Sequence, residues 1–196
     1  MKNPLSISLV ALLLAALPAR ADIVAREVET AYPVSGATGA ALYASIGERG
    51  PNIRDGAARA IAHTVFDLKW HRDYEPDGSA CVLAAAKPFL TITTTLPKPA
   101  QTLPPDVAAR WRVFIAGIRA HEAVHGEFIR DMARDIAAAT IGFRQENDPG
   151  CKQIRKAVVA PIQAAFDRYK ARNAAFEQAE MAPGGPVRRL ILDLVN

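Results

Sequence analysis

Alternating side chains predict a strand over residues 60–71. Thr64, Phe66, Leu68 and Trp70 fall on one face of this strand, and mainly polar residues fall on the other. A period of two with one largely apolar face is typical of a half-buried strand.

Two further β-prone runs accompany it. Residues 27–36 form a short first run, and residues 81–99, rich in β-branched side chains, follow a turn built on Asp77-Gly78. We therefore expect a small antiparallel sheet between about residues 28 and 97.

A helical periodicity, with apolar residues three and four apart, governs other segments. Residues 38–51 predict a short helix with Thr38 as N-cap and Gly50-Pro51 as its stop. After the proline-rich connection PKPAQTLPPD, a long helix is expected over Val107–Phe143, capped by Asp106. Its inward stripe comprises Trp111, Phe114, Ile115, Ile118, Phe128, Ile129, Met132 and Ile136.

A second long helix is expected from Cys151 to about Glu180, with a kink at Pro161. Its inner face comprises Ile154, Val158, Ile162, Phe166 and Tyr169. Residues 181–196 are expected to form a flexible C-terminal tail. Strands followed by helices predict an α+β fold, with one domain over residues 22–180.

The first 21 residues are expected to be a secretory signal peptide. Lys2 precedes an apolar run from Leu5 to Leu17, and the small residues Ala19 and Ala21 favour cleavage before Asp22. An uncleaved membrane anchor is the alternative, but the run is shorter than the roughly 20 residues that cross a bilayer. The protein is therefore expected to be secreted or periplasmic.

Composition is that of a globular protein, with 50% hydrophobic and 22% charged residues among 196. Removing Lys2 and Arg20 with the leader takes 24 basic residues to 22 against 20 acidic ones, a net charge of +2. This balance does not favour nucleic acid as a partner, and no other segment favours stable membrane insertion. The oligomeric state is not determined by the sequence.

Export changes the interpretation of the two cysteines, Cys81 and Cys151. Two cysteines in an oxidising compartment usually pair, and these lack the C-x-x-C spacing of a structural zinc site. We expect a structural disulfide between them.

The stripe of the long helix is interrupted by the motif H-E-x-x-H. His121 and His125 lie one helical turn apart and face inward with the stripe, so their imidazoles can converge on one zinc ion. Glu122 is placed to act as the general base for a zinc-activated water that attacks a peptide carbonyl. This pattern predicts one Zn²⁺ and an exported metallopeptidase, a hydrolase whose partner is a peptide or protein substrate.

The third zinc ligand has several candidates. Phe128 replaces the glycine of H-E-x-x-H-x-x-G-x-x-H, so the helix continues and Asp131 points away, while Asp135 lies about 15 Å along the axis from His125. We take Glu177 as the working third ligand. The other candidates are Glu146, Glu180, His63 and His71.

The chain resembles a bacterial family of predicted secreted zinc-dependent proteases (domain of unknown function 922). The resemblance covers roughly residues 30–180 and is carried by YPVSGATGAALYASIGERGP, TVFDLKW, TTTLP, RAHEAVH and the order of the two cysteines. It implies a zincin-like metallopeptidase with His121 and His125 as ligands and Glu122 as base.

The chain departs from this family near its end. Family members tend to close with Tyr-Asp…Thr-x-His-Gly, whereas this chain has AAFEQAEMAPGG, with Phe176 and Glu177 at the Tyr-Asp place and no histidine. Two other functions therefore stay open: a catalytically inactive zincin-like scaffold or interaction protein, and a zinc amidase acting on cell-wall peptides.

Overall fold

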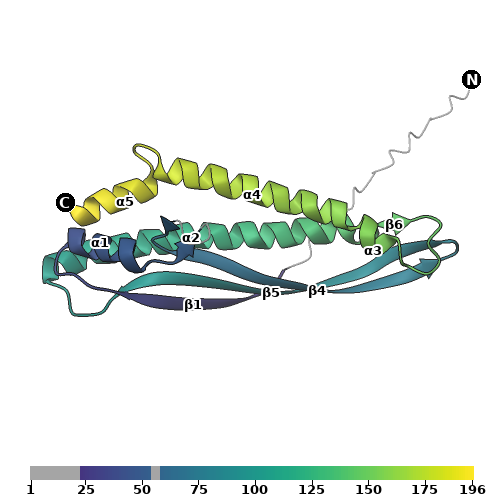
Figure 1. The fold of residues 1–196 in the computed structure, drawn as a ribbon, viewed down its shortest axis with the longest axis horizontal. Helices are drawn as coiled ribbons and strands as arrows, with labels where there is room; N and C mark the ends of the chain where they lie inside the picture. Colours follow the sequence, from purple (N-terminus) through teal and green to yellow (C-terminus); the bar gives the residue numbers. More distant parts are fainter. Residues whose placement is uncertain (1–22, 54–57) are drawn as a thin grey trace, which may run out of the picture.

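The computed structural model describes residues 23–53 and 58–196, and the expected signal peptide lies outside them. In this part of the chain, a twisted sheet carries the helices on one of its faces (Figure 1). The elements are β1 (Ala25–Val34), α1 (Gly39–Arg49), β2 (Asn52–Ile53), β3 (Ala58–Arg59), β4 (His63–Asp77), β5 (Ala80–Pro99), α2 (Pro105–Thr140), β6 (Arg144–Gln145), α3 (Ile154–Ala157), α4 (Val159–Met181) and α5 (Pro186–Val195).

The main sheet is mixed and not purely antiparallel as expected. β5 is its central strand; β4 pairs with β5 in an antiparallel hairpin, whereas β1 pairs with it in parallel, from Ala25 opposite Leu90 to Val34 opposite Pro99. The prediction was wrong about β1 because side chains alternate with the same period in both kinds of ladder. Between β1 and β5 the chain passes through α1 and then through β4, which runs antiparallel to both, so β5 is parallel to β1.

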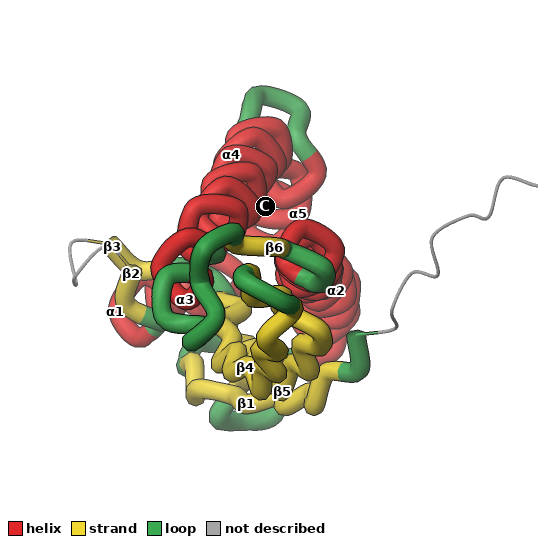
Figure 2. Tube along the Cα trace, turned by 90° about the vertical axis from the view of Figure 1, so that its right-hand side faces the viewer, coloured by secondary structure: helices red, strands yellow, loops and turns green. Residues whose placement is uncertain are grey.

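The alternation predicted for β4 is present. Thr64 is buried, Phe66, Leu68 and Trp70 are half-buried, and the intervening residues Val65, Asp67 and Lys69 are exposed. The inner face contacts the helices, because the ring of Phe66 stacks on Phe166 of α4 with centroids 6.4 Å apart. Figure 2 shows α2 and α4 on the same side of the strands.

The caps of α1 follow the sequence prediction. The Thr38 side chain accepts a hydrogen bond from the Ala41 amide at 3.2 Å, and the Gly50 amide donates to the Ile46 carbonyl at 2.8 Å. These bonds satisfy backbone groups that the first and last turns leave without helical partners.

Helix α2 has 36 residues and therefore spans about 54 Å at 1.5 Å per residue. It begins at Pro105, and its N-cap is Pro104, so the prediction that Asp106 caps it was wrong. Proline is well suited to the first helical position, so the helix starts two residues earlier than expected. Asp106 instead lies in the first turn, where it pairs with Arg110 at 3.4 Å.

The second helical segment is divided into α3 and α4 at Val158. Pro161 has no amide proton for the carbonyl of Ala157, and its ring crowds that carbonyl, so the helix breaks at this point. The structure therefore has a break before Pro161 where the sequence predicts a kink. The expected inner-face residues Ile154 and Val158 are buried.

The last residues differ from the expected flexible tail because they form helix α5. Val187 and Leu194 are buried in a cluster with residues of α1 and α2. The N-terminus of α1 approaches α5 so closely that a Cβ on Gly39 would lie 1.7 Å from the Leu194 carbonyl oxygen. A short apolar segment becomes ordered here because the body of the protein offers it an apolar surface.

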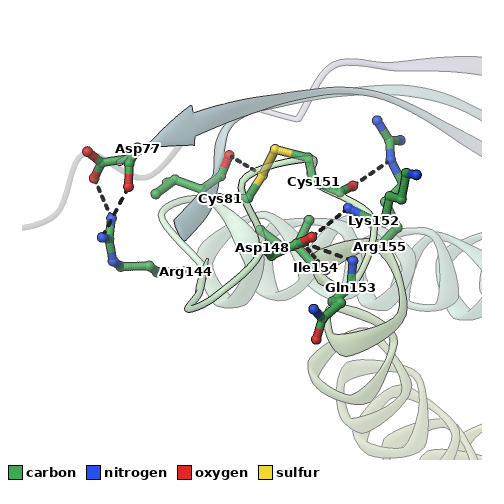
Figure 3. Close-up of a disulfide and its surroundings, with 10 residues drawn as sticks. Asp77, Cys81, Arg144, Asp148, Cys151, Lys152, Gln153, Ile154 and Arg155 are labelled. Atoms are coloured by element: carbon green, nitrogen blue, oxygen red, sulfur yellow. Dashed lines mark hydrogen bonds and ion pairs between the residues drawn. A yellow bond between two sulfur atoms is a disulfide. The ribbon is translucent and has the colours of Figure 1, made fainter. Parts of the chain in front are cut away.

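A disulfide joins Cys81 of β5 to Cys151, as predicted (Figure 3). Beside it, the buried Asp148 carboxylate accepts hydrogen bonds from the amides of Lys152, Gln153 and Ile154 at 2.8–2.9 Å. Burial acts to raise the pKa of Asp148, but these amide donors outweigh it and hold the pKa below its usual value. This region fastens the connection between α2 and α4 to the far end of the hairpin.

The buried stripe of α2 positions the candidate site. Ile118 belongs to one apolar cluster with α1 and α5, and Ile129 to a second with β5 and α4. The H-E-x-x-H motif lies between these two clusters. No helix in the described ranges is long and apolar enough to cross a bilayer.

Candidate metal centre

His121 and His125 converge on one point beside α2. Their Nε2 atoms are 3.0 Å apart, and both side chains are about nine-tenths buried. The two rings meet edge to face, with centroids 4.7 Å apart, because residues four apart share one face of a helix. Both imidazoles therefore present a nitrogen to the same small volume.

Glu177 of α4 brings a carboxylate to this point. Its Oε1 lies 2.9 Å from Nε2 of His125 and 3.4 Å from Nε2 of His121. A tetrahedral ion with bonds of about 2.0–2.1 Å separates its ligand atoms by roughly 3.3–3.4 Å, close to the three distances found here. His121, His125 and Glu177 thus form a group that could hold a metal ion.

Asn173 fixes the protonation of His125. The Asn173 amide nitrogen donates to the Tyr169 carbonyl at 2.8 Å, so its Oδ1 is the atom that faces Nδ1 of His125, at 2.6 Å. Nδ1 must carry a proton to donate to that oxygen, so the neutral ring, the form that binds a metal, has its lone pair on Nε2. A neighbour that orients the ligand in this way is usual for histidines that bind metals.

Phe176 holds the ring of His121. The two rings are stacked, with centroids 4.8 Å apart and planes inclined by 18°, and Phe176 also meets the ring of His125 edge-on. Nε2 of His121 faces the carboxylate of Glu177, while Nδ1 lies 3.5 Å from Oε2 of Glu180.

Glu122 is buried beside the histidines and is held by the sheet. Its Oε2 accepts a hydrogen bond from the Thr64 hydroxyl of β4 at 2.7 Å. The Thr64 hydroxyl has one proton, which it donates to Glu122. The hydroxyl of Thr94, 3.0 Å away on β5, therefore donates to the Thr64 oxygen. A chain of two hydroxyls thereby orients one oxygen of the carboxylate.

The electrostatic environment favours a charged carboxylate among basic rings. Hydrogen bonds with His121 and His125 hold the pKa of Glu177 far below its usual value despite partial burial. Burial lowers the pKa of His125, but its bonds with Glu177 and Asn173 and the charge of Glu122 outweigh burial and raise the pKa above its ordinary value. Glu177 is therefore an anion at neutral pH, as a metal ligand must be.

A pocket of about 600 Å³ opens over this group, between α2, α4 and residues 59–64. His121, Glu122, His125 and Glu177 all line it. The rest of the wall is largely apolar and includes Tyr43, Ile53, Ile61, Ile118, Met181 and Val187. Such a volume is typical of a small-molecule or side-chain binding site.

The other candidate ligands do not belong to the group of three. Glu146 is exposed and bonded to Arg144 at 2.6 Å, and His71 is exposed and 3.1 Å from Asp73. His63 lines the pocket without joining the group of three. Asp131 and Asp135, which the sequence analysis excluded as ligands, have other partners. Asp131 bonds to Arg134 and Arg172, and Asp135 lies 3.5 Å from Arg168.

Asn173, Phe176 and Thr64 were not predicted as parts of the site. Asn173 lies on the inner face of α4, one turn beyond Tyr169. It is a polar residue in an otherwise apolar stripe. Thr64 is likewise the only hydroxyl on the inner face of β4 between residues 64 and 70. In both cases, a polar residue within an apolar series was the sequence feature that could have indicated a site residue.

Comparison with known proteins now identifies the family. The model of the family described as "Bacterial protein of unknown function (DUF922)" matches residues 29–185. The chain belongs to this family. The matched segment contains His121, Glu122, His125, Glu177 and Glu180. Neither the curated proteins nor the solved structures contain a significant match.

Proposed function

We propose that this DUF922 protein is an exported zinc metallopeptidase with a zincin-like arrangement of its active site. One observation carries the proposal: two imidazole nitrogens and a carboxylate oxygen converge in a pocket that also contains a buried, oriented glutamate. Structural zinc sites have four protein ligands, whereas catalytic sites have three and keep a position for water.

The donor set fits zinc. His121 and His125 supply neutral nitrogens and Glu177 supplies a charged oxygen, a combination found in catalytic zinc sites. Asn173 holds His125 so that the lone pair of the neutral ring is on Nε2. Within the described part of the chain, this lone pair can bind only a cation or a proton.

In the proposed mechanism, a bound zinc would lower the pKa of a water and polarise the substrate carbonyl. Glu122 would take the proton of the attacking water and pass it to the leaving amine. The Thr64 hydroxyl holds one oxygen of Glu122, while the other has no hydrogen-bond partner among the described residues and is free to accept that proton. Glu177 and the two histidines would hold the metal in the same pocket as Glu122.

The apolar part of the pocket wall suits a side chain of a peptide. The wall beside the metal group includes Tyr43, Ile61, Ile118 and Val187, which favour an apolar side chain. Amide hydrolysis is one of the reactions in which a general base next to the metal ligands has a purpose.

Export is the second part of the proposal. It is supported by the leader-like first residues and by the Cys81–Cys151 disulfide, a bond that persists in oxidising compartments. Mass spectrometry of the exported form is expected to find Asp22 at the N-terminus.

Metal analysis and peptide hydrolysis test the function together. We expect about one zinc per chain, lost in His121→Ala and His125→Ala but retained in the control His71→Ala, whose histidine is exposed and outside the group. Glu122→Gln should retain zinc and lower hydrolysis about 10²–10⁴-fold, because only the base is removed.

Other outcomes would distinguish the alternatives. Undiminished turnover in Glu122→Gln removes Glu122 from the mechanism. A zinc-loaded protein that cleaves neither extended peptides nor cell-wall peptides is a scaffold, and cleavage of cell-wall peptides alone indicates an amidase. A metal-free protein under zinc-replete conditions refutes the proposal as a whole.

A further inference from the structure

His121 carries a buried nitrogen without a hydrogen bond. Its Nδ1 has no hydrogen-bond partner in the described part of the chain, although the side chain is only 9% exposed. A buried polar atom of this kind normally has a partner. The corresponding Nδ1 of His125 has a partner, the side-chain oxygen of Asn173.

Glu180 is the acceptor placed opposite this nitrogen. Its Oε2 lies 3.5 Å from Nδ1 of His121, a few tenths of an ångström beyond hydrogen-bond distance. The Glu180 side chain is 15% exposed and makes no other hydrogen bond or ion pair within the described ranges. The carboxylate is largely shielded from water, and its one recorded partner within the described ranges is the ring of His121.

Glu180 is not in a position to bind the same ion as Glu177. It faces Nδ1, whereas Nε2 on the opposite side of the ring faces Glu177 and His125. Stacking on Phe176 holds the ring in this orientation. Glu180 and the far side of His121 also line a separate pocket of about 480 Å³ between α2, α4 and α5.

We propose that Glu180 is a positioning residue that accepts a hydrogen bond from Nδ1–H of His121 and so directs the lone pair of Nε2 onto the metal. This inference rests on the proposed function. Its consequence is an unequal pair of ligands, because a carboxylate supports His121 and a neutral amide supports His125. A carboxylate acceptor makes an imidazole a stronger donor, so His121 is the more tightly held ligand.

The experiment measures zinc affinity by competition with a chelator in the full chain. We expect Glu180→Ala to weaken zinc binding about 10–100-fold, as usual for a lost partner of a metal-bound histidine. Glu180→Gln keeps an acceptor oxygen and should lose less. Gln178→Ala, an exposed residue of the same helix, is the matched control and should bind zinc as the wild type does.

Two further measurements separate positioning from folding. Thermal melting of each metal-free variant checks that the chain is folded. In zinc-loaded protein, two-bond ¹H–¹⁵N spectra of the histidine rings should show a protonated Nδ1 on His121, with a signal that moves in Glu180→Gln but not in Gln178→Ala.

The inference is overturned if Glu180→Ala binds zinc within about twofold of wild type while Glu177→Ala and His125→Ala lose it; the proposed function then stands. If Glu177→Ala and His125→Ala also keep wild-type affinity, the metal site itself is refuted, and this inference with it.

Discussion

At the scale of single residues, the site depends on buried polar groups whose partners come from other elements. Glu122 on α2 is oriented by Thr64 on β4, and His125 on α2 by Asn173 on α4. A buried carboxylate without a donor is costly, so each partner both stabilises the fold and sets the geometry of the chemistry.

Thr64→Val tests this dual role. The change removes the donor to Glu122 and leaves its Oε2 buried without a partner, so we expect a loss of about 1–3 kcal/mol in the free energy of unfolding, measured in urea. Peptide hydrolysis should fall while zinc content is unchanged, because Thr64 contacts the base and has no hydrogen bond to the histidines.

The control is Thr93→Val, on the opposite face of β5, where Thr93 pairs with the exposed Val65. Its effect on stability should lie within about 0.5 kcal/mol. Equal stability of Thr64→Val and Thr93→Val would mean that the bond to Glu122 contributes nothing to folding.

At the scale of elements, α5 determines how the C-terminal end of α4 is held. It follows Glu177 and Glu180 after a short turn and packs into the cluster that contains Ile118, one turn before His121 on α2. The site therefore lies between α2 and α4, and α5, which follows α4, shares an apolar cluster with α2. Loosening α5 should affect the site as well as stability.

Leu194→Ala is the corresponding prediction. Leu194 is 1% exposed, so truncation leaves a cavity and should cost about 2–5 kcal/mol in the free energy of unfolding. Leu192→Ala on the same helix removes a side chain that is 47% exposed and should cost about 0.5 kcal/mol or less. Similar melting curves for the two variants would show that α5 does not dock as described.

At the scale of the whole molecule, the disulfide and the candidate site are located in different places. β6 and α3 lie at one end of the molecule, and α1 and α5 at the other (Figure 1). The disulfide belongs to the first end, because Cys81 pairs with Gln145 of β6 and Cys151 precedes α3. The metal group is formed by residues of α2 and α4. The long helix α2 connects these regions. Its ion pairs, such as Arg119 with Glu29 at 3.0 Å, fasten it to the edge strand β1.

Removal of the disulfide should therefore lower stability without changing the site. A Cys81→Ser/Cys151→Ser variant releases a loop of 70 residues and should lose at most about 4 kcal/mol in the free energy of unfolding. Below its melting temperature, its zinc affinity should equal that of the wild type, measured by chelator competition. Reductant should destabilise the wild type only, and a parallel loss of zinc affinity would contradict this separation.

The sequence by itself determined the features that depend on neighbouring residues along the chain. The N-cap at Thr38, the alternation of β4 and the shared face of His121 and His125 follow from backbone geometry, which repeats every two residues in a strand and every 3.6 in a helix. The pairing of Cys81 with Cys151 also followed, because the described chain contains no other cysteine.

Only the tertiary structure decided the relations between distant segments. It set β1 parallel to β5, selected Glu177 over Glu146 as the carboxylate beside the histidines, turned Glu180 toward the other side of His121 and ordered α5. Periodicity states which face a side chain occupies, but not which element will cover that face. The partner depends on how helices and strands pack across the whole chain, and that is a property of the folded molecule.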